Sequence, residues 1–299
     1  MSEMLEKFGM GWLPDYPDFR DYTINHDEVS PRLLKLGQKV TLKKMLTKIG
    51  VKNPAKVSIP VSVNLQEWFS PVENQGSLGS CTANAGVALV EYFEKKAFQK
   101  HTDASRLFLY KTTRNLMQQT GDIGAYLRTT MGALVLFGVP PEEYWPYKIT
   151  DFDQEPPAFC YAFAQNYQSL TYYRLDPPGI TKNNLLDQIK TNLAGGLPSM
   201  FGFTVYSSIE EAATTGKIPY PATGDRILGG HAIVAAGYDD NMVNTNARPG
   251  ALLIRNSWGK EWGENGYGWL PYDYVLNGLA VDWWSLLKNE WVDAGNFKL

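Results

Sequence analysis

The feature that most constrains this chain is a glutamine six residues before a cysteine that opens a helical pattern. Residues 74–81 read NQGSLGSC, and apolar side chains then recur at helical spacing through Phe93. They are Ala85, Ala88, Leu89, Tyr92 and Phe93. We therefore predict that Cys81 lies at the amino terminus of a helix. The helix dipole there favours an anionic sulfur.

Two later segments add a histidine and an asparagine. GGHA at residues 229–232 leads into an apolar strand, and LLIRNSWG at residues 252–259 ends another. Each piece alone has an ordinary explanation: a lone cysteine is usually a small buried hydrophobe, and an Asn-Ser pair is usually turn chemistry. We favour catalysis because Gln75, Cys81, His231 and Asn256 occur in one chain, each in its own local context.

On these motifs, residues 59–299 resemble the papain-like cysteine proteases, in a branch without disulfides. The matching segments are IPVSVNLQEW at 59–68, the Gln75 to Cys81 run, His231, NSWG at 256–259 and GYGW at 266–269. The resemblance implies an α+β, two-lobed papain-like fold. Its helical lobe and its antiparallel, barrel-like β lobe would face each other across the active-site cleft.

The resemblance also implies a role for each site residue. Cys81 is expected to be the nucleophile, paired as a thiolate with a His231 imidazolium. Asn256 would orient the ring, and Trp258 would shield that bond from water. The side chain of Gln75 and the backbone of Cys81 would donate to the oxyanion of the tetrahedral intermediate.

Three positions depart from the family pattern. Leu78 replaces a disulfide cysteine, Thr82 replaces an aromatic residue after the nucleophile, and Gly230 precedes the histidine where some members carry an acidic residue. The flanks of the papain motif therefore fail. None of these positions performs chemistry, so we expect activity to be retained. We also expect the pH profile of that activity to differ from that of the plant members of the family.

Substrate contacts follow from the resemblance alone. Gly124 corresponds to a glycine whose backbone pairs with the substrate chain. Gly202 and Ala232 fall in the pocket for the residue two before the scissile bond. Because both are small, the expected pocket is roomy and apolar, and would favour Leu, Phe or Val.

Composition narrows the class of protein. Apolar residues make up 44% of 299 residues, enough for a sizeable core, and a net charge of -3 gives no general reason to expect nucleic acid. Two cysteines, one of them the candidate nucleophile, leave Cys160 without a disulfide partner. This favours a reducing compartment. No signal-peptide core or membrane-length apolar run occurs, so cytoplasmic is the default expectation, with signal-independent export left open.

Residues 1–57 differ in character from residues 58–299, which we divide into a mainly helical lobe (58–165) and a mainly β lobe (166–299). We expect residues 1–57 to act as a prosegment-like inhibitor covering part of the cleft, with Trp12, Tyr16 and Phe19 as plugs. Eight basic and no acidic residues lie between Arg32 and Lys56. We favour a helix with its lysines in solvent over a site for nucleic acid or another anion.

The other expected elements follow from periodicity. Helices are predicted at 124–137 and 181–193, and a short helix passes through Leu42, Met45, Leu46 and Ile49. Strands are predicted at 200–206, 232–238, 251–256 and 267–270. Helices first and strands later is the α+β order.

We thus predict a cysteine endopeptidase that acts on peptides or proteins through an acyl-enzyme thioester, without metal or organic cofactor. Two alternatives stay open at this stage. One is a catalytically silent relative that binds peptides. The other is a transamidase or amidase that uses the same nucleophile.

Overall fold

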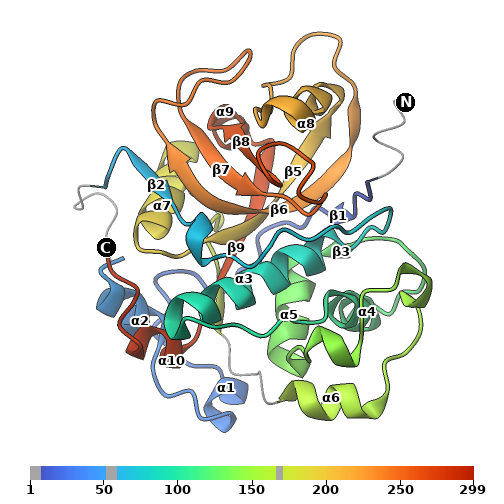
Figure 1. Cartoon of the computed structure of the whole chain (residues 1–299). Coiled ribbons are helices and arrows are strands. Elements are labelled where there is room, and N and C mark those ends of the chain that lie inside the picture. Colours follow the sequence, from blue (N-terminus) through green and yellow to red (C-terminus); the bar gives the residue numbers. More distant parts are fainter. Residues whose placement is uncertain (1–7, 52–58, 166–170) are drawn as a thin grey trace.

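The computed structural model describes residues 8–51, 59–165 and 171–299. Helices α3, α4, α5 and α6 gather in one half of the molecule, and an antiparallel sheet fills the other half (Figure 1). The helices span Cys81–Phe98 (α3), Arg106–Leu116 (α4), Leu127–Phe137 (α5) and Ala158–Ala164 (α6). The fold is therefore the α+β arrangement that the sequence predicts.

The sheet runs in the order β4, β9, β5, β6, β7, β8, and β2 pairs with β6. The strands are β2 (Ser62–Asn64), β4 (Thr171–Arg174), β5 (Ser199–Tyr206), β6 (Ile227–Asp239), β7 (Ala251–Arg255), β8 (Tyr267–Pro271) and β9 (Ala280–Leu287). Helix α7 (Lys182–Ala194) contacts β6. The four predicted strands are confirmed as β5 to β8, with β6 longer than predicted at both ends.

Helix α3 joins the two halves because it is buried on nearly every side. All residues from Cys81 to Phe93 are buried. At Gly86 an added Cβ would lie 3.2 Å from the side chains of Leu109 and Thr130. A glycine here lets α4 and α5 approach closely, so this helix holds Cys81 on a rigid element at the boundary of the sheet.

The helix predicted at 124–137 begins three residues late. Ala125–Tyr126 instead forms strand β3, which pairs in parallel with β1 (Trp12–Leu13). The partner strand lies more than 110 residues away in sequence, so no local sequence pattern could predict this pairing. The helix predicted at 181–193 is α7, and the Thr181 hydroxyl caps it by accepting from the Asn184 N–H.

The short lysine-rich helix is confirmed as α2 (Leu42–Ile49), with Leu42, Met45, Leu46 and Ile49 buried. Two of its lysines make exposed ion pairs, Lys43 with Asp27 at 3.4 Å and Lys48 with Asp293 at 2.7 Å. The Lys48 partner belongs to α10 (Asn289–Asp293), which also contacts α3. Lys52 and Lys56 lie outside the described residues.

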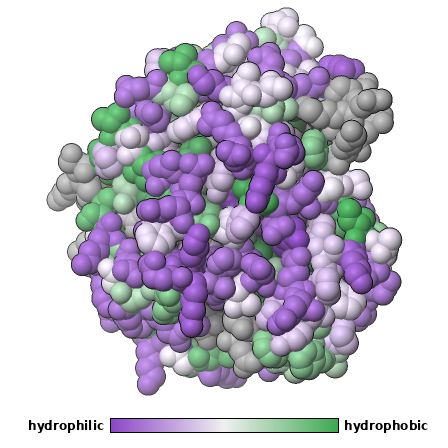
Figure 2. Space-filling model, in the orientation of Figure 1, coloured by the Kyte–Doolittle hydropathy of each residue, from purple (hydrophilic) through white to green (hydrophobic). Residues whose placement is uncertain are grey.

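The outer surface is mainly polar. Figure 2 shows hydrophilic side chains over most of the face seen in Figure 1, with hydrophobic ones scattered among them. Apart from α1 (Pro31–Lys35), α8 (Ala212–Thr215) and α9 (Asp273–Leu276), the remaining described helices are short 3₁₀ turns. None of the helices in the described ranges is long and apolar enough to cross a membrane.

Candidate active site

Cys81 is the first residue of α3 and is fully buried. A side chain from a later segment holds the loop before Cys81 in place, because the Gly79 N–H donates to Asp122 Oδ1 at 2.9 Å. Asp122 also accepts from the Tyr110 hydroxyl at 2.6 Å, and that hydroxyl accepts from the Gly124 N–H at 3.1 Å. Sequence reasoning missed Asp122, which ties the nucleophile loop to the Gly124 loop.

His231 lies in β6 and Asn256 directly follows β7. Asn256 Oδ1 lies 2.8 Å from His231 Nε2 and also accepts the Ser257 backbone N–H at 2.8 Å. An oxygen that accepts from Ser257 is fixed as an acceptor, so the ring proton belongs on Nε2. His231 Nδ1 is then the nitrogen available for proton transfer, and it is buried without a hydrogen bond from the described residues.

The backbone next to His231 approaches Cys81 at the start of α3. The Ala232 backbone N–H, next to His231 in the chain, lies close enough to the Cys81 thiol to favour its anion. The structure therefore places the chain at Ala232, the residue after His231, beside Cys81.

Trp258 packs over the ring of His231. The two rings stack with centroids 4.6 Å apart and an interplanar angle of 23°. Phe8 stacks on Trp258, with centroids 5.0 Å apart. The indole thus covers the His231–Asn256 bond from one side, the position expected for a shield against water.

Gln75 is buried, and its side chain is held at both ends. Its Oε1 accepts the Ser257 hydroxyl at 2.5 Å. Its Nε2 donates to the carbonyl oxygens of Leu78 at 2.8 Å and Gly9 at 2.9 Å. The amide is therefore fixed with its N–H groups as donors, and one of them points at the amino-terminal segment.

Residues 8–13 run along these same side chains. The Gly9 N–H donates to the Gly76 carbonyl at 2.8 Å, and the Ala125 N–H donates to the Gly11 carbonyl at 2.8 Å. A Cβ at Gly124 would lie 2.2 Å from the Gly11 oxygen, which explains the glycine. The segment thus forms backbone bonds on both sides of Cys81.

Trp12 is the large side chain of this segment that enters the protein. A Cβ at Gly202 would fall 1.9 Å from its ring, and one at Gly230 would fall 2.8 Å from it. Ala232 is paired with Gly202 across β5 and β6. Tyr16 and Phe19 are 90% and 89% exposed, so the expectation that they also act as plugs is wrong. Both lie in the bend beyond β1, where the chain has left this surface.

Burial sets the protonation of the pair in this form of the protein. Desolvation raises the pKa of Cys81 to about 11, although nearby backbone N–H groups oppose it. Desolvation also lowers the pKa of His231 to about 4, against the opposing hydrogen bond to Asn256. The expected thiolate and imidazolium are therefore neutral here, because both charged forms would be cut off from water.

The buried His231 has a consequence for acid stability. Between pH 6.5 and 4 the unfolded chain gains a proton on this histidine that the folded chain does not, so the free energy of unfolding falls as pH falls. The loss amounts to about 3 kcal/mol. Asp282, whose pKa burial raises to about 6, acts in the opposite direction over much the same range. We therefore expect the His231→Gln variant, measured by urea unfolding, to gain about 3 kcal/mol on the parent between pH 7 and 4. A constant difference across that range would contradict the neutral buried ring.

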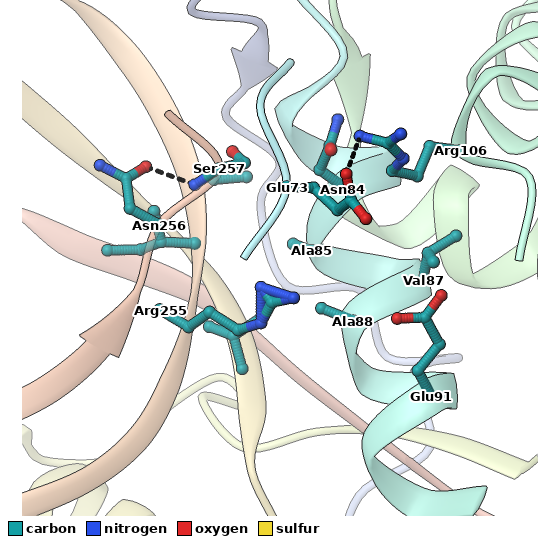
Figure 3. A pocket seen from close by; sticks show the side chains of 13 residues that line it. Glu73, Asn84, Ala85, Val87, Ala88, Glu91, Arg106, Arg255, Asn256 and Ser257 are labelled. Carbon is teal, nitrogen blue, oxygen red and sulfur yellow. Dashed lines mark hydrogen bonds and ion pairs between the residues drawn. The ribbon is translucent and has the colours of Figure 1, made fainter. Parts of the chain in front are cut away.

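A small cavity lies behind the site, between α3, the middle of β6 and the end of β7 (Figure 3). Its volume is about 10 Å³, room for about one water molecule. Arg106 pairs with Glu73 at its edge at 3.1 Å, and the buried Arg255 donates to the Pro71 carbonyl at 2.7 Å. The cavity is part of the polar interface between the two halves and is too small for a substrate side chain.

Within the described ranges, no group of three or more histidine, cysteine or carboxylate side chains could hold a metal ion. Cys81 and Cys160 are both free and buried. The two cysteines of the chain therefore form no disulfide with each other.

This geometry and a match to the family model for papain family cysteine proteases over residues 59–278 place the chain in that family. A peptidase C1-like protein of Acanthamoeba polyphaga mimivirus is 33% identical over 282 residues, covering 92% of this chain and 86% of that protein. Papain from Carica papaya is 27% identical over 225 residues, covering 73% of this chain and 56% of that protein.

Solved structures agree. The crystal structure of xylellain, a cysteine protease from Xylella fastidiosa, matches with a TM-score of 0.72 and 32% identity, covering 95% of this chain and 97% of that one. Bromelain from Ananas comosus matches with a TM-score of 0.56 and 20% identity, covering 77% of this chain and all of that one, which supports the fold alone.

Proposed function

We propose that this chain is a cysteine endopeptidase whose nucleophile is Cys81. The observation that carries the proposal is the fixed pair of His231 and Asn256 beside the start of α3, with the ring proton on Nε2 and Nδ1 left for exchange. A ring held in this tautomer can accept the thiol proton and later donate it.

The reaction proceeds in two halves. The Cys81 thiolate attacks the peptide carbonyl carbon, and the negative oxygen accepts hydrogen bonds from Gln75 Nε2 and the Cys81 N–H. His231 protonates the amine as the C–N bond breaks, which leaves a thioester. A water molecule then gives its proton to His231 and attacks the thioester, so the acid product leaves and the thiolate returns.

We also propose that residues 8–13 silence this site until they move away. Gly9 accepts the hydrogen bond that Gln75 would give to the oxyanion, and Trp12 fills space beside Gly202. The same segment keeps water from the pair, which disfavours the thiolate. Release of the segment would both open the site and allow the ion pair to form.

The test is intact mass after incubation with an epoxide that alkylates cysteine proteases irreversibly. We expect one adduct after the segment is removed, its loss in Cys81→Ala, and its retention in the matched control Cys160→Ala. Hydrolysis of a peptide amide by the unlabelled protein is expected alongside. An adduct without hydrolysis of any peptide would favour a transamidase or amidase, and no adduct at all would favour a silent peptide-binding relative.

A further inference from the structure

The space that Trp12 fills is bounded on two sides by the backbone of glycine residues. We call it the Trp12 recess, formed by Gly202, Gly230 and Asp282. Both glycines lie so close to the indole that any side chain there would overlap it. The recess therefore admits a large flat ring because two neighbouring strands, β5 and β6, lack side chains at this point.

The inner end of the recess is a carboxylate. The Trp12 indole N–H donates to Asp282 Oδ2 at 3.1 Å, and Asp282 is fully buried. A buried carboxylate is costly unless it is paired, so its presence in the core needs a reason.

The backbone at Asp282 is also unusual. Along β9, Trp284 pairs with Met200 and Val281 pairs with Gly202, so two residues of β9 face Phe201 alone. Asp282 lies in this bulge with a φ of 62°, in the left-handed region that is unfavourable for a non-glycine residue. Such bulges redirect a side chain, and strain of this kind clusters at functional sites.

The two oxygens of Asp282 have different surroundings. Oδ1 accepts the Trp284 indole N–H at 2.7 Å and pairs with Arg174 at 3.2 Å, both from the protein core. Oδ2 accepts from Trp12 and from no other donor in the described ranges. When Trp12 leaves, one acceptor faces the emptied recess while the other stays bound.

We infer that Asp282 determines substrate specificity: the Trp12 recess takes a large flat peptide side chain that ends in a neutral N–H donor, with tryptophan preferred. This inference rests on the proposed function, since the recess is then the pocket for the residue two before the scissile bond. It replaces the expected preference for Leu, Phe or Val, because an apolar side chain would leave Oδ2 buried without a partner.

A neutral donor occupies Oδ2 in the structure, and the Asp282 carboxylate already has a counter-ion at Oδ1. Arg174 lies against Oδ1 and also pairs with Asp176 at 2.9 Å. The guanidinium groups of Arg174 and Arg128 lie 5.1 Å and 5.7 Å from the Trp284 ring. Both arginines also pair with carboxylates, Arg174 with Asp21 and Asp176 and Arg128 with Asp15 and Asp21. A peptide with arginine is therefore included in the test, so that a neutral donor and a cation are compared directly.

The experiment compares peptides that are identical except for tryptophan, 2-naphthylalanine or arginine at that position. The full-length Trp12→Gly chain is given two peptides in one reaction. Because both compete for the same enzyme, the fraction of molecules with an open site cancels from the ratio of kcat/KM. Each of the same peptides is also titrated separately, by calorimetry, into the full-length chain carrying Trp12→Gly and Cys81→Ala. Binding is then measured without turnover.

We expect tryptophan to exceed naphthylalanine by about tenfold or more in both measurements. Asp282→Asn should remove this preference, because the amide oxygen must face Trp284 and Arg174 and its NH₂ then faces the recess. Asp153→Asn, a control at a carboxylate that pairs with the buried Arg114 away from the recess, should keep it. If the chain with Asp282 intact showed equal kcat/KM and affinity for the tryptophan and naphthylalanine peptides, or preferred the arginine peptide, the inference would be overturned whatever the variants do. A binding preference without turnover would support the inference and contradict the endopeptidase proposal.

Discussion

Removing residues 1–57 should raise kcat/KM for a fluorogenic peptide by about 10³-fold. The full-length chain can act only while Gly9, Gly11 and Trp12 have left their partners. If about one molecule in 10³ is open, the segment contributes about 4 kcal/mol to the closed form. Two backbone–backbone hydrogen bonds, the bond from the Gln75 side chain to the Gly9 carbonyl, one buried indole bond and the stacked Phe8 are enough for that free energy.

The comparison is made between full-length protein and a chain beginning near Val57, each normalised to the Cys81 that an irreversible inhibitor titrates. Normalisation separates loss of folding from loss of activity. In the full-length chain, Trp12→Gly should activate partly, while Tyr16→Ala, which changes a side chain that is 90% exposed, should not. Equal normalised rates with and without residues 1–57 would end the proposal that they inhibit.

Replacing Gln75 by alanine in the released enzyme should lower kcat by about 10²- to 10³-fold, or about 2.7–4 kcal/mol of barrier, with KM little changed. In the structure this amide donates to a carbonyl oxygen, Gly9, in the manner proposed for the oxyanion. The developing charge strengthens that bond only in the transition state, so the loss should appear in kcat.

The control for this variant is Ser257→Ala, which removes the 2.5 Å bond that orients Gln75 but keeps the donor. We expect it to lose much less activity. Steady-state kinetics on one peptide, with active sites titrated, give both numbers. If Gln75→Ala changed KM and left kcat intact, its N–H would be a ground-state contact and the oxyanion assignment would be wrong.

Sequence patterns predicted those parts of the protein that depend on neighbours in the chain. The helix at Cys81, the lysine-rich α2, the strand that contains His231 and the strand that ends just before Asn256 follow from apolar spacing over a few turns or a few strand residues. The residue types of the candidate site were likewise visible, because each stands in its own local motif. Helix α4 was missed since its polar residues, Arg114 among them, are buried by tertiary contacts.

Other properties needed distant segments to meet. The pairing of β1 with β3, the bond from Gln75 to Gly9 and the bulge at Asp282 join residues more than 60 positions apart. The ionisation of Cys81 and His231 depends on how much water the surrounding segments exclude.

The sequence by itself therefore determined the family, the candidate site residues and the elements that carry or adjoin Cys81, His231 and Asn256, because these depend on local spacing and motif. Only the tertiary structure decided the neutral state of the pair, the carboxylate end of the Trp12 recess and the path of residues 8–13. Burial, charge and long-range contacts exist only once the chain has packed. They then set the pKa values of Cys81 and His231 and the polarity of the Trp12 recess.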